Sequence, residues 1–181
     1  MRKLFKKFDM QVATVNAAAS KLSDPEVGTP GVEVTPAGLR VIAAVNLGED
    51  VLKRCGIEHG MRVFDLECGV GDASLAIADL VGPAGLVVGI DQSAAAIDIA
   101  ERRATVAGQC YWMRFVTADL NTFVPPERFD AVVVRLSLFR QGVSTSLLRL
   151  AAYVRPYGVI VVAPDTSTED ADLILSRIGS R

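Results

Sequence analysis

Residues 61–71 read Met-Arg-Val-Phe-Asp-Leu-Glu-Cys-Gly-Val-Gly, and this stretch decides the fold. An apolar run ends at Asp65, and a loop containing Gly69 and Gly71 follows it. The next segment, 72–81, has the apolar spacing of a helix, so the pattern predicts a strand, a glycine loop and a helix. Because glycine has no Cβ, such a loop lets the backbone approach a ligand closely.

Two later apolar segments also lead to an acid. Residues 86–91 end in Asp91, and residues 112–116 lead to Asp119. The carboxyl ends of parallel strands meet at one edge of a sheet, so acids at three such ends would line one crevice. Helical patterns alternate with the apolar segments, which predicts an α/β fold with a doubly wound parallel sheet. The predicted strands are 62–66, 86–91, 112–116, 129–134 and 159–163, and the predicted helices are 72–81, 94–107, 144–154 and 168–178.

Taken in order, residues from about 50 to 165 resemble the class I methyltransferase family, which has a Rossmann-like fold and binds S-adenosylmethionine. The family's first loop usually reads Asp-x-Gly-x-Gly-x-Gly. This chain reads Asp-Leu-Glu-Cys-Gly-Val-Gly from Asp65 to Gly71, with Glu67 in place of the first glycine. The turn before the family's fifth strand usually carries two glycines after a proline, and here Tyr157 replaces the first.

The resemblance implies the strand order 3-2-1-4-5, with the crevice between the first and fourth strands. Family members usually add a terminal antiparallel strand pair that completes a seven-stranded sheet. This chain ends at Arg181 after one more predicted helix, so we expect the fold to lack that pair. The fifth strand, 159–163, would then be left at an edge. Either the chain is shortened, or another subunit covers the edge, or the last helix does.

The resemblance also implies a cofactor site and an acceptor pocket. In the family, the acid after the second strand holds the ribose hydroxyls and matches Asp91. The acid after the third strand contacts the adenine amino group and matches Asp119. The implied cofactor-binding residues are Asp65, Glu67, Cys68, Gly69, Gly71, Asp91, Gln92, Asp119 and Leu120, and the implied acceptor-pocket residues are Arg135, Leu136, Ser137 and Phe139. For Arg135, a strand-end salt bridge is an equal alternative.

Glu67 is the residue on which the function depends. The family places this position against the methionine part of the cofactor. The carboxylate of Glu67 could pair with the cofactor ammonium in a charge-assisted contact. It could instead fill the methionine site and repel the cofactor carboxylate. Both orientations are compatible with the sequence.

Three functions fit these residues. The first is an S-adenosylmethionine-dependent methyltransferase that acts on a small molecule, for example in natural-product biosynthesis. The second is a methyltransferase-fold protein with non-methylating chemistry, a cyclase or pericyclase, and the third is a non-catalytic partner subunit. Methyl transfer needs alignment and exclusion of water rather than a fixed constellation, so we assign no catalytic residue. A dinucleotide enzyme is disfavoured, because it would give Asp65 and Asp119 no role.

The composition restricts the class of protein. The chain has 181 residues, a formal net charge of −2 and 50% hydrophobic residues, as expected of one globular domain with a sizeable core. The slightly acidic balance argues against nucleic-acid binding. Apolar runs are too short to span a membrane, so we expect a cytoplasmic protein. The cysteines have no metal-ligand spacing, and His59 precedes the first strand at the wrong end of the sheet, so no metal is expected.

We divide the chain into residues 1–35 and residues 36–181. Apolar residues at helical spacing predict an amphipathic helix over 3–22, followed by a loop rich in glycine and proline. Thr35 followed by proline is typical of a helix start, and we expect a helix from there toward Cys55, with a break near Gly48 as an alternative to one continuous helix. Residues 1–35 would form a cap or an interface, which predicts a homo- or hetero-oligomer, and the remainder would form the Rossmann-like domain.

Overall fold

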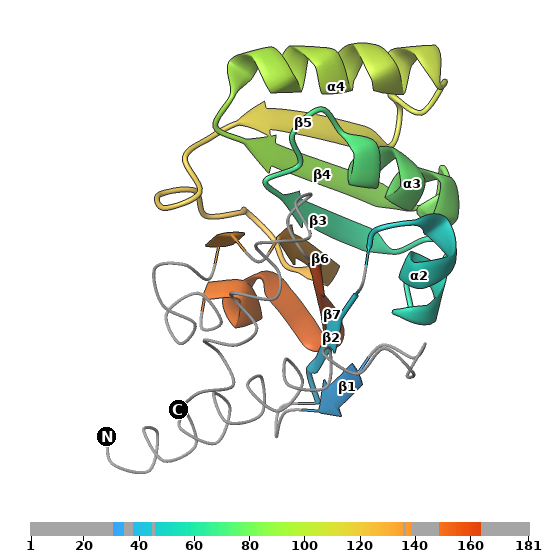
Figure 1. Cartoon of the computed structure of the whole chain (residues 1–181), viewed down its shortest axis with the longest axis vertical. Coiled ribbons are helices and arrows are strands. Elements are labelled where there is room, and N and C mark those ends of the chain that lie inside the picture. The colour runs from blue at the N-terminus through green and yellow to red at the C-terminus, as the bar shows by residue number, and fades with distance from the viewer. Residues whose placement is uncertain (1–30, 35–37, 45, 136, 139–148, 164–181) are drawn as a thin grey trace.

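The computed structural model describes residues 31–34, 38–44, 46–135, 137–138 and 149–163 (Figure 1). The described strands make a seven-stranded sheet in the order β1-β2-β7-β6-β3-β4-β5. They are β1 (Gly31–Val34), β2 (Arg40–Ala43), β3 (Arg62–Leu66), β4 (Leu86–Asp91), β5 (Met113–Thr117), β6 (Phe129–Arg135) and β7 (Val154–Ala163). The helices are α2 (Glu49–Arg54), α3 (Asp72–Val81) and α4 (Ala94–Val106), and residues 149–153 are also helical.

The centre of the sheet has the predicted Rossmann-like arrangement. Strands β5, β4, β3, β6 and β7 reproduce the order 3-2-1-4-5, and each pairs in parallel with its neighbour. In this register Asp65 of β3 lies opposite Gly89 of β4 and Val133 of β6. The carboxyl ends of these strands therefore form one edge, and the point where the strand order reverses lies between β3 and β6.

The edge beyond β7 differs from the prediction. Strand β2 runs parallel to β7, with Arg40 opposite Val159, and β1 pairs antiparallel with β2. The prediction of one helix from Thr35 toward Cys55 is therefore wrong over residues 40–43, although α2 occupies its last part. The prediction that the fifth strand lies open at an edge is also wrong. Two strands that precede the central sheet in sequence cover it, so an uncovered edge no longer argues for a partner subunit.

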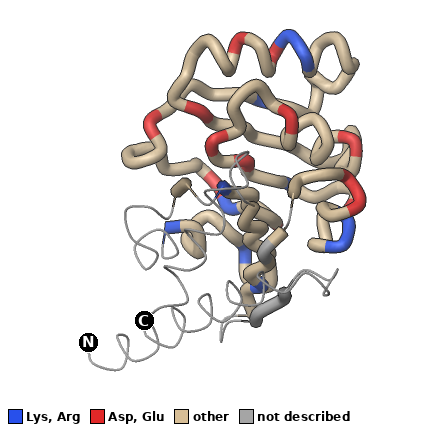
Figure 2. Tube along the Cα trace, viewed as in Figure 1, with Lys and Arg blue, Asp and Glu red and all other residues tan. Residues whose placement is uncertain are grey.

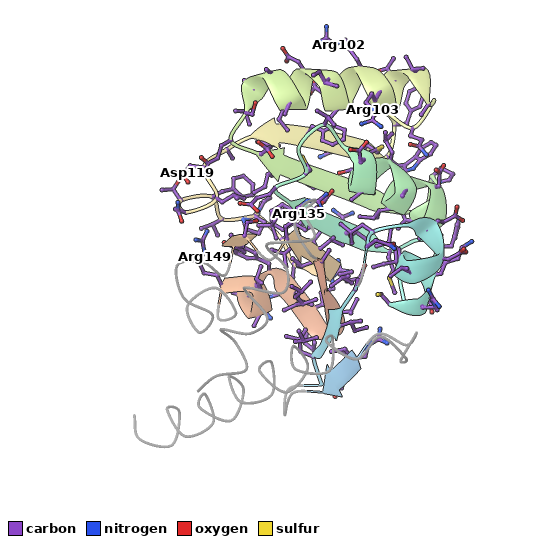
Figure 3. The ribbon with its side chains drawn as sticks, viewed as in Figure 1. Arg102, Arg103, Asp119, Arg135 and Arg149 are labelled. Carbon is purple, nitrogen blue, oxygen red and sulfur yellow. The ribbon has the colours of Figure 1, made fainter. Side chains whose placement is uncertain are left out.

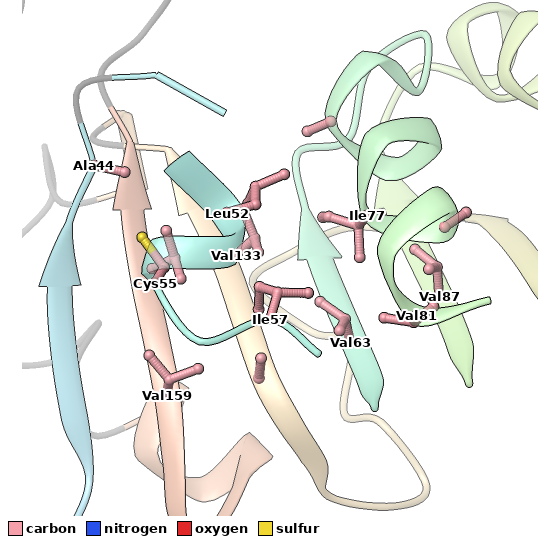
Figure 4. Close-up of a cluster of buried hydrophobic side chains, with 14 of the residues drawn as sticks. Ala44, Leu52, Cys55, Ile57, Val63, Ile77, Val81, Val87, Val133 and Val159 are labelled. Carbon is pink, nitrogen blue, oxygen red and sulfur yellow. The ribbon is translucent and has the colours of Figure 1, made fainter. Parts of the chain in front are cut away.

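Successive side chains along each strand point to opposite faces of the sheet, so the apolar core consists of one cluster on each face. Val63 and Val87 face α2, α3 and α4, where they join one buried apolar cluster with Ile77 (Figure 4). Phe64 faces the other way and joins a second cluster with residues of the 118–128 connection and of 149–153. Because side chains point to opposite faces in turn, a sheet buried on both faces reads as a continuous apolar run. That is the pattern of the sequence at 86–90 and 159–163.

Several sequence predictions fall outside the described residues. They include the helices at 3–22 and 168–178 and the first part of the helix at 144–154, whose described residues 149–153 are helical. The sheet includes β1, which precedes the boundary proposed at residue 35. Within the described residues, no helix has the length and apolar character that crossing a membrane requires.

The place of β2 in the core gives a stability prediction. Ile42 is 0% exposed at the middle of β2, so Ile42→Ala should lower the free energy of unfolding by about 2–5 kcal/mol in a urea titration. The control Val106→Ala removes a side chain that is 90% exposed on α4, and its effect should stay below about 0.5 kcal/mol. Equal effects of the two substitutions would contradict the placement of β2 inside the sheet.

Candidate functional site

The residues predicted to bind a cofactor come together at the carboxyl edge of the sheet. Acidic segments follow the ends of the parallel strands there (Figure 2). Asp65 and Asp91 belong to β3 and β4, and Asp119 lies two residues beyond β5. Arg135, the last residue of β6, lies at the same edge (Figure 3).

The glycine loop turns sharply between β3 and α3. Gly69 and Gly71 have φ values of 56° and 85°, which side chains rarely adopt. A Cβ on Gly71 would lie 3.1 Å from the Cβ of Ala100, so glycine is needed where the start of α3 meets α4. A Cβ on Gly69 would meet nothing within 4 Å, so the loop is open on that side.

The carboxylate of Asp91 joins this loop to the end of β4. Its Oδ2 accepts a hydrogen bond from the Gly69 backbone N–H at 2.9 Å, and its Oδ1 accepts one from the Ser93 N–H at 2.8 Å. Each carboxylate oxygen has a second lone pair. Asp91 can therefore hold the loop and still accept hydrogen bonds from two neighbouring hydroxyl groups of a ligand.

Asp65 lies beneath the loop and is only 3% exposed. The Ser74 hydroxyl, on α3, donates to its Oδ2 at 2.5 Å. Burial raises the pKa of the Asp65 carboxyl to about 6, while the Ser74 hydrogen bond and the positive charge of Arg135 oppose that rise. The sequence did not lead us to connect Ser74 with Asp65, although a polar residue in the first turn of the helix after the glycine loop was a usable signal.

Glu67 has a φ of 58°, an unusual value for a residue with a side chain. Such a conformation costs of order 1 kcal/mol or more and persists only where the surroundings hold it. Here the Ser137 hydroxyl donates to Glu67 Oε2 at 2.5 Å. The carboxylate is thus directed from the β3 loop toward Ser137, two residues beyond the end of β6.

The turn after β5 places the third acid at the surface. Asp119 is exposed, and its Oδ1 accepts the Asn121 N–H at 2.8 Å. Leu120 is buried, and Gln92 is exposed beside Asp91. Asp119 and Gln92 are therefore accessible to a ligand at this edge.

The other predicted site residues have distinct surroundings. Cys68 is buried, and burial raises the pKa of its thiol well above the usual range, so it is protonated at neutral pH. A nucleophilic role, which needs the thiolate, is disfavoured. Arg135 is half-buried and its charge acts on Asp65. Leu136 and Phe139 lie outside the described residues.

A separate cavity of about 410 Å³ lies at the opposite, amino edge of the sheet. His59 and Tyr157 are among its lining residues, and Arg155 there forms an ion pair with Asp130 at 2.6 Å. Ligands of open parallel sheets bind at the carboxyl edge. The strand-end acids and the glycine loop are both at that edge, so we place the functional site there.

The fold and the site define a Rossmann-like protein whose glycine loop and strand-end acids can hold a nucleoside cofactor. The sequence profile of the family described as "Methyltransferase domain" matches residues 63–158, and the chain belongs to this family. The cofactor indicated by the family and by structural neighbours is S-adenosylmethionine. The open side of Gly69 and the spare acceptor capacity of Asp91 fit that cofactor.

The chain is similar to individual methyltransferases and to one cyclase of known structure. Demethylmenaquinone methyltransferase from Geobacillus kaustophilus is 37% identical over 119 residues, which are 66% of this chain and 51% of that protein. A methyltransferase from Thiobacillus denitrificans, solved with S-adenosylhomocysteine, has a TM-score of 0.54 at 27% identity, over 65% of this chain and 49% of its own. The cyclase SpnF has a TM-score of 0.51 at 26% identity, and the match covers 62% of this chain and 42% of the cyclase. The chain spans about half the length of the curated relatives it matches.

The buried carboxyl predicts a pH dependence. The pKa of Asp65 is about 6 in the folded protein and about 3.9 when unfolded, so the unfolded chain releases this proton first as the pH rises. The stability of the wild type relative to Asp65→Asn, measured by urea unfolding, should fall by about 2 kcal/mol between pH 4 and pH 7. A difference that stays constant over this range would contradict the assigned burial of Asp65.

Proposed function

We propose that this chain is an S-adenosylmethionine-dependent methyltransferase that acts on a small molecule. The observation that carries the proposal is the Asp91 carboxylate, which holds the open glycine loop at Gly69 and keeps lone pairs for two further hydroxyl groups. The cofactor has a ribose diol, and a diol needs such a pair of acceptors. A small-molecule acceptor is supported by the relative that methylates demethylmenaquinone.

In the proposed binding mode, the connections after three strands each contact a different part of the cofactor. Asp91 would accept from the ribose hydroxyls, and Asp119 and Leu120 would border the adenine. The glycine loop would lie along the methionine part, where the Glu67 carboxylate would accept a hydrogen bond from the ammonium group. The bound cofactor supplies a methyl group already activated by its sulfonium. The protein therefore needs to align the acceptor and exclude water.

The acceptor would enter beside the end of β6. Arg135 and Ser137 lie there, and Ser137 already contacts Glu67. A guanidinium near the transfer point suits an acceptor that carries a carboxylate or an ionised hydroxyl. Natural-product biosynthesis is the setting we infer for such an acceptor. Association through residues 1–35 stays a prediction.

A second candidate function is non-methylating chemistry in the same crevice. It is favoured by Glu67, which replaces a family glycine, and by the likeness to a cyclase. A cyclase of this fold would bind the cofactor and convert its substrate without consuming the methyl donor. Product mass distinguishes the two, because methyl transfer adds one methyl group and releases S-adenosylhomocysteine. A non-catalytic subunit would convert no substrate.

The ribose contact is tested by Asp91→Asn, which keeps one carbonyl oxygen for the Gly69 N–H. Calorimetric titration should show S-adenosylhomocysteine binding weakened by about 1.5–3 kcal/mol, because hydrogen bonds to a charged acceptor are lost. The matched control, Asp98→Asn, changes an exposed acid of α4 and should leave binding unchanged. If Asp91→Asn bound as well as the wild type, the assignment of the ribose site would be wrong.

The role of Glu67 is tested by removing its charge in Glu67→Gln. If Glu67 receives the ammonium, this variant should bind S-adenosylhomocysteine about 1–3 kcal/mol more weakly. It should bind an analogue that lacks the amino group as well as the wild type does. Tighter binding of S-adenosylhomocysteine by the variant would show instead that Glu67 opposes the cofactor.

A further inference from the structure

We propose that Arg149 and Tyr153 are positioning residues that give the turn 119–123 the shape needed to recognise adenine. This inference rests on the proposed function, because it assumes that the cofactor binds at this edge. Neither residue belongs to the strand ends or the glycine loop. They lie in the helical residues 149–153, which precede β7.

The two side chains hold two carbonyl groups of the turn. Arg149 Nη2 donates to the Leu120 carbonyl, and the Tyr153 hydroxyl donates to the Phe123 carbonyl at 3.0 Å. Arg149 also donates to the Tyr153 oxygen, from Nε at 3.3 Å and from Nη2 at 3.2 Å. The two residues are four apart in a helix, so their side chains lie on one face and act as a pair. Figure 3 shows Arg149 and Asp119 on the same side of the molecule.

The turn's own hydrogen bonds do not fix its position. Asp119 accepts the Asn121 N–H through Oδ1, and its carbonyl accepts the N–H groups of Thr122 and Phe123 at 3.1 and 2.9 Å. These bonds close the turn on itself. At its start the turn is joined to β4 through the Ala118 N–H, which donates to the Asp91 carbonyl at 2.9 Å. The Arg149–Tyr153 pair holds the opposite end.

The pair is itself fixed by the core of the sheet. The Tyr153 side chain is 7% exposed, and its ring contacts the Phe64 ring edge-on with centroids 5.8 Å apart. Phe64 belongs to β3, and the Phe123 ring of the turn lies 6.0 Å from it. The turn, the helical residues and the strand that leads into the glycine loop therefore share one buried cluster.

This arrangement has a consequence for recognition. The Asp119 carboxylate accepts the Asn121 N–H of the same turn, so its direction toward a ligand follows the backbone of the turn. A charged guanidinium and a buried phenol hold that backbone before any ligand arrives. A preorganised site avoids the cost of ordering the turn on binding. The contribution of the pair should thus appear in the selection of adenine and not only in stability.

The experiment compares two ligands that differ at the adenine amino group. Wild type, Tyr153→Phe and Arg149→Met are titrated calorimetrically with S-adenosylhomocysteine and with S-inosylhomocysteine, in which an oxygen replaces that amino group. Tyr153→Phe keeps the ring and removes one hydroxyl oxygen. Arg155→Met is the matched control, because Arg155 pairs with Asp130 at the opposite edge of the sheet. Melting temperatures are recorded for every variant.

The wild type should prefer S-adenosylhomocysteine by about tenfold or more. Tyr153→Phe and Arg149→Met should bind it about tenfold more weakly, and their preference over the inosine compound should fall at least about threefold. Arg155→Met should keep the wild-type preference.

Two results would overturn the inference. If the wild type binds but the variants keep its preference, including the case in which binding of both ligands weakens equally, the pair only stabilises the fold and the proposed function stands. If the wild type binds neither ligand, the proposed function and the inference fall together. Should Arg149→Met not fold, Tyr153→Phe alone decides.

Discussion

The carboxylate of Asp91 is the interaction on which the site depends. It accepts N–H groups from the glycine loop at Gly69 and from the start of α4 at Ser93, so one side chain fixes the relative positions of two adjacent connections. The parallel register of β3 and β4 brings these connections together at the carboxyl edge. Without that register the acids would lie at unrelated places on the surface. With it, they lie along one edge of the sheet.

Two further hydrogen bonds join other strand connections to this arrangement. Ser137 links the glycine loop to the end of β6 through Glu67, and Arg149 links the turn after β5 to the helical residues before β7. Each contact joins segments far apart in the sequence. Together they connect the ends of the central strands, so the adenine, ribose and methionine parts of the proposed cofactor site would be held by one connected set of hydrogen bonds. A change at one contact should therefore affect its neighbours.

The sequence predicted the parts of the fold that depend on local patterns. Apolar runs ending at Asp65 and Asp91 predicted β3 and β4, and the glycines between them predicted the loop. The strand β2 was missed, because four residues from Arg40 to Ala43 are too short for periodicity to separate a strand from a helix. Its pairing with β7 is a long-range event that no neighbouring residue signals. The open edge was predicted because the family's terminal strand pair was expected to be absent, and β2 pairs with β7 at that edge instead.

The candidate site likewise contains residues that local sequence patterns indicated and residues whose roles depend on long-range contacts. Asp91 and Asp119 could be proposed from the sequence because each follows an apolar run that predicts a strand. Ligands of open parallel sheets bind at the carboxyl ends of the strands. Arg149 and Tyr153 could not be assigned, because their roles come from partners that only the folded chain brings close. Glu67 was recognised as the decisive position, but its direction toward Ser137 depends on a contact between residues 70 positions apart.

The central claim is that the carboxyl edge of the sheet binds S-adenosylmethionine, and calorimetric titration of the wild type tests it most directly. S-adenosylmethionine and S-adenosylhomocysteine should each bind with a stoichiometry of about one per chain, at micromolar dissociation constants or below, on the order of −8 kcal/mol. Adenosine should compete for the same site. The absence of a binding isotherm for both compounds at millimolar concentration, with a folded protein, would contradict the account.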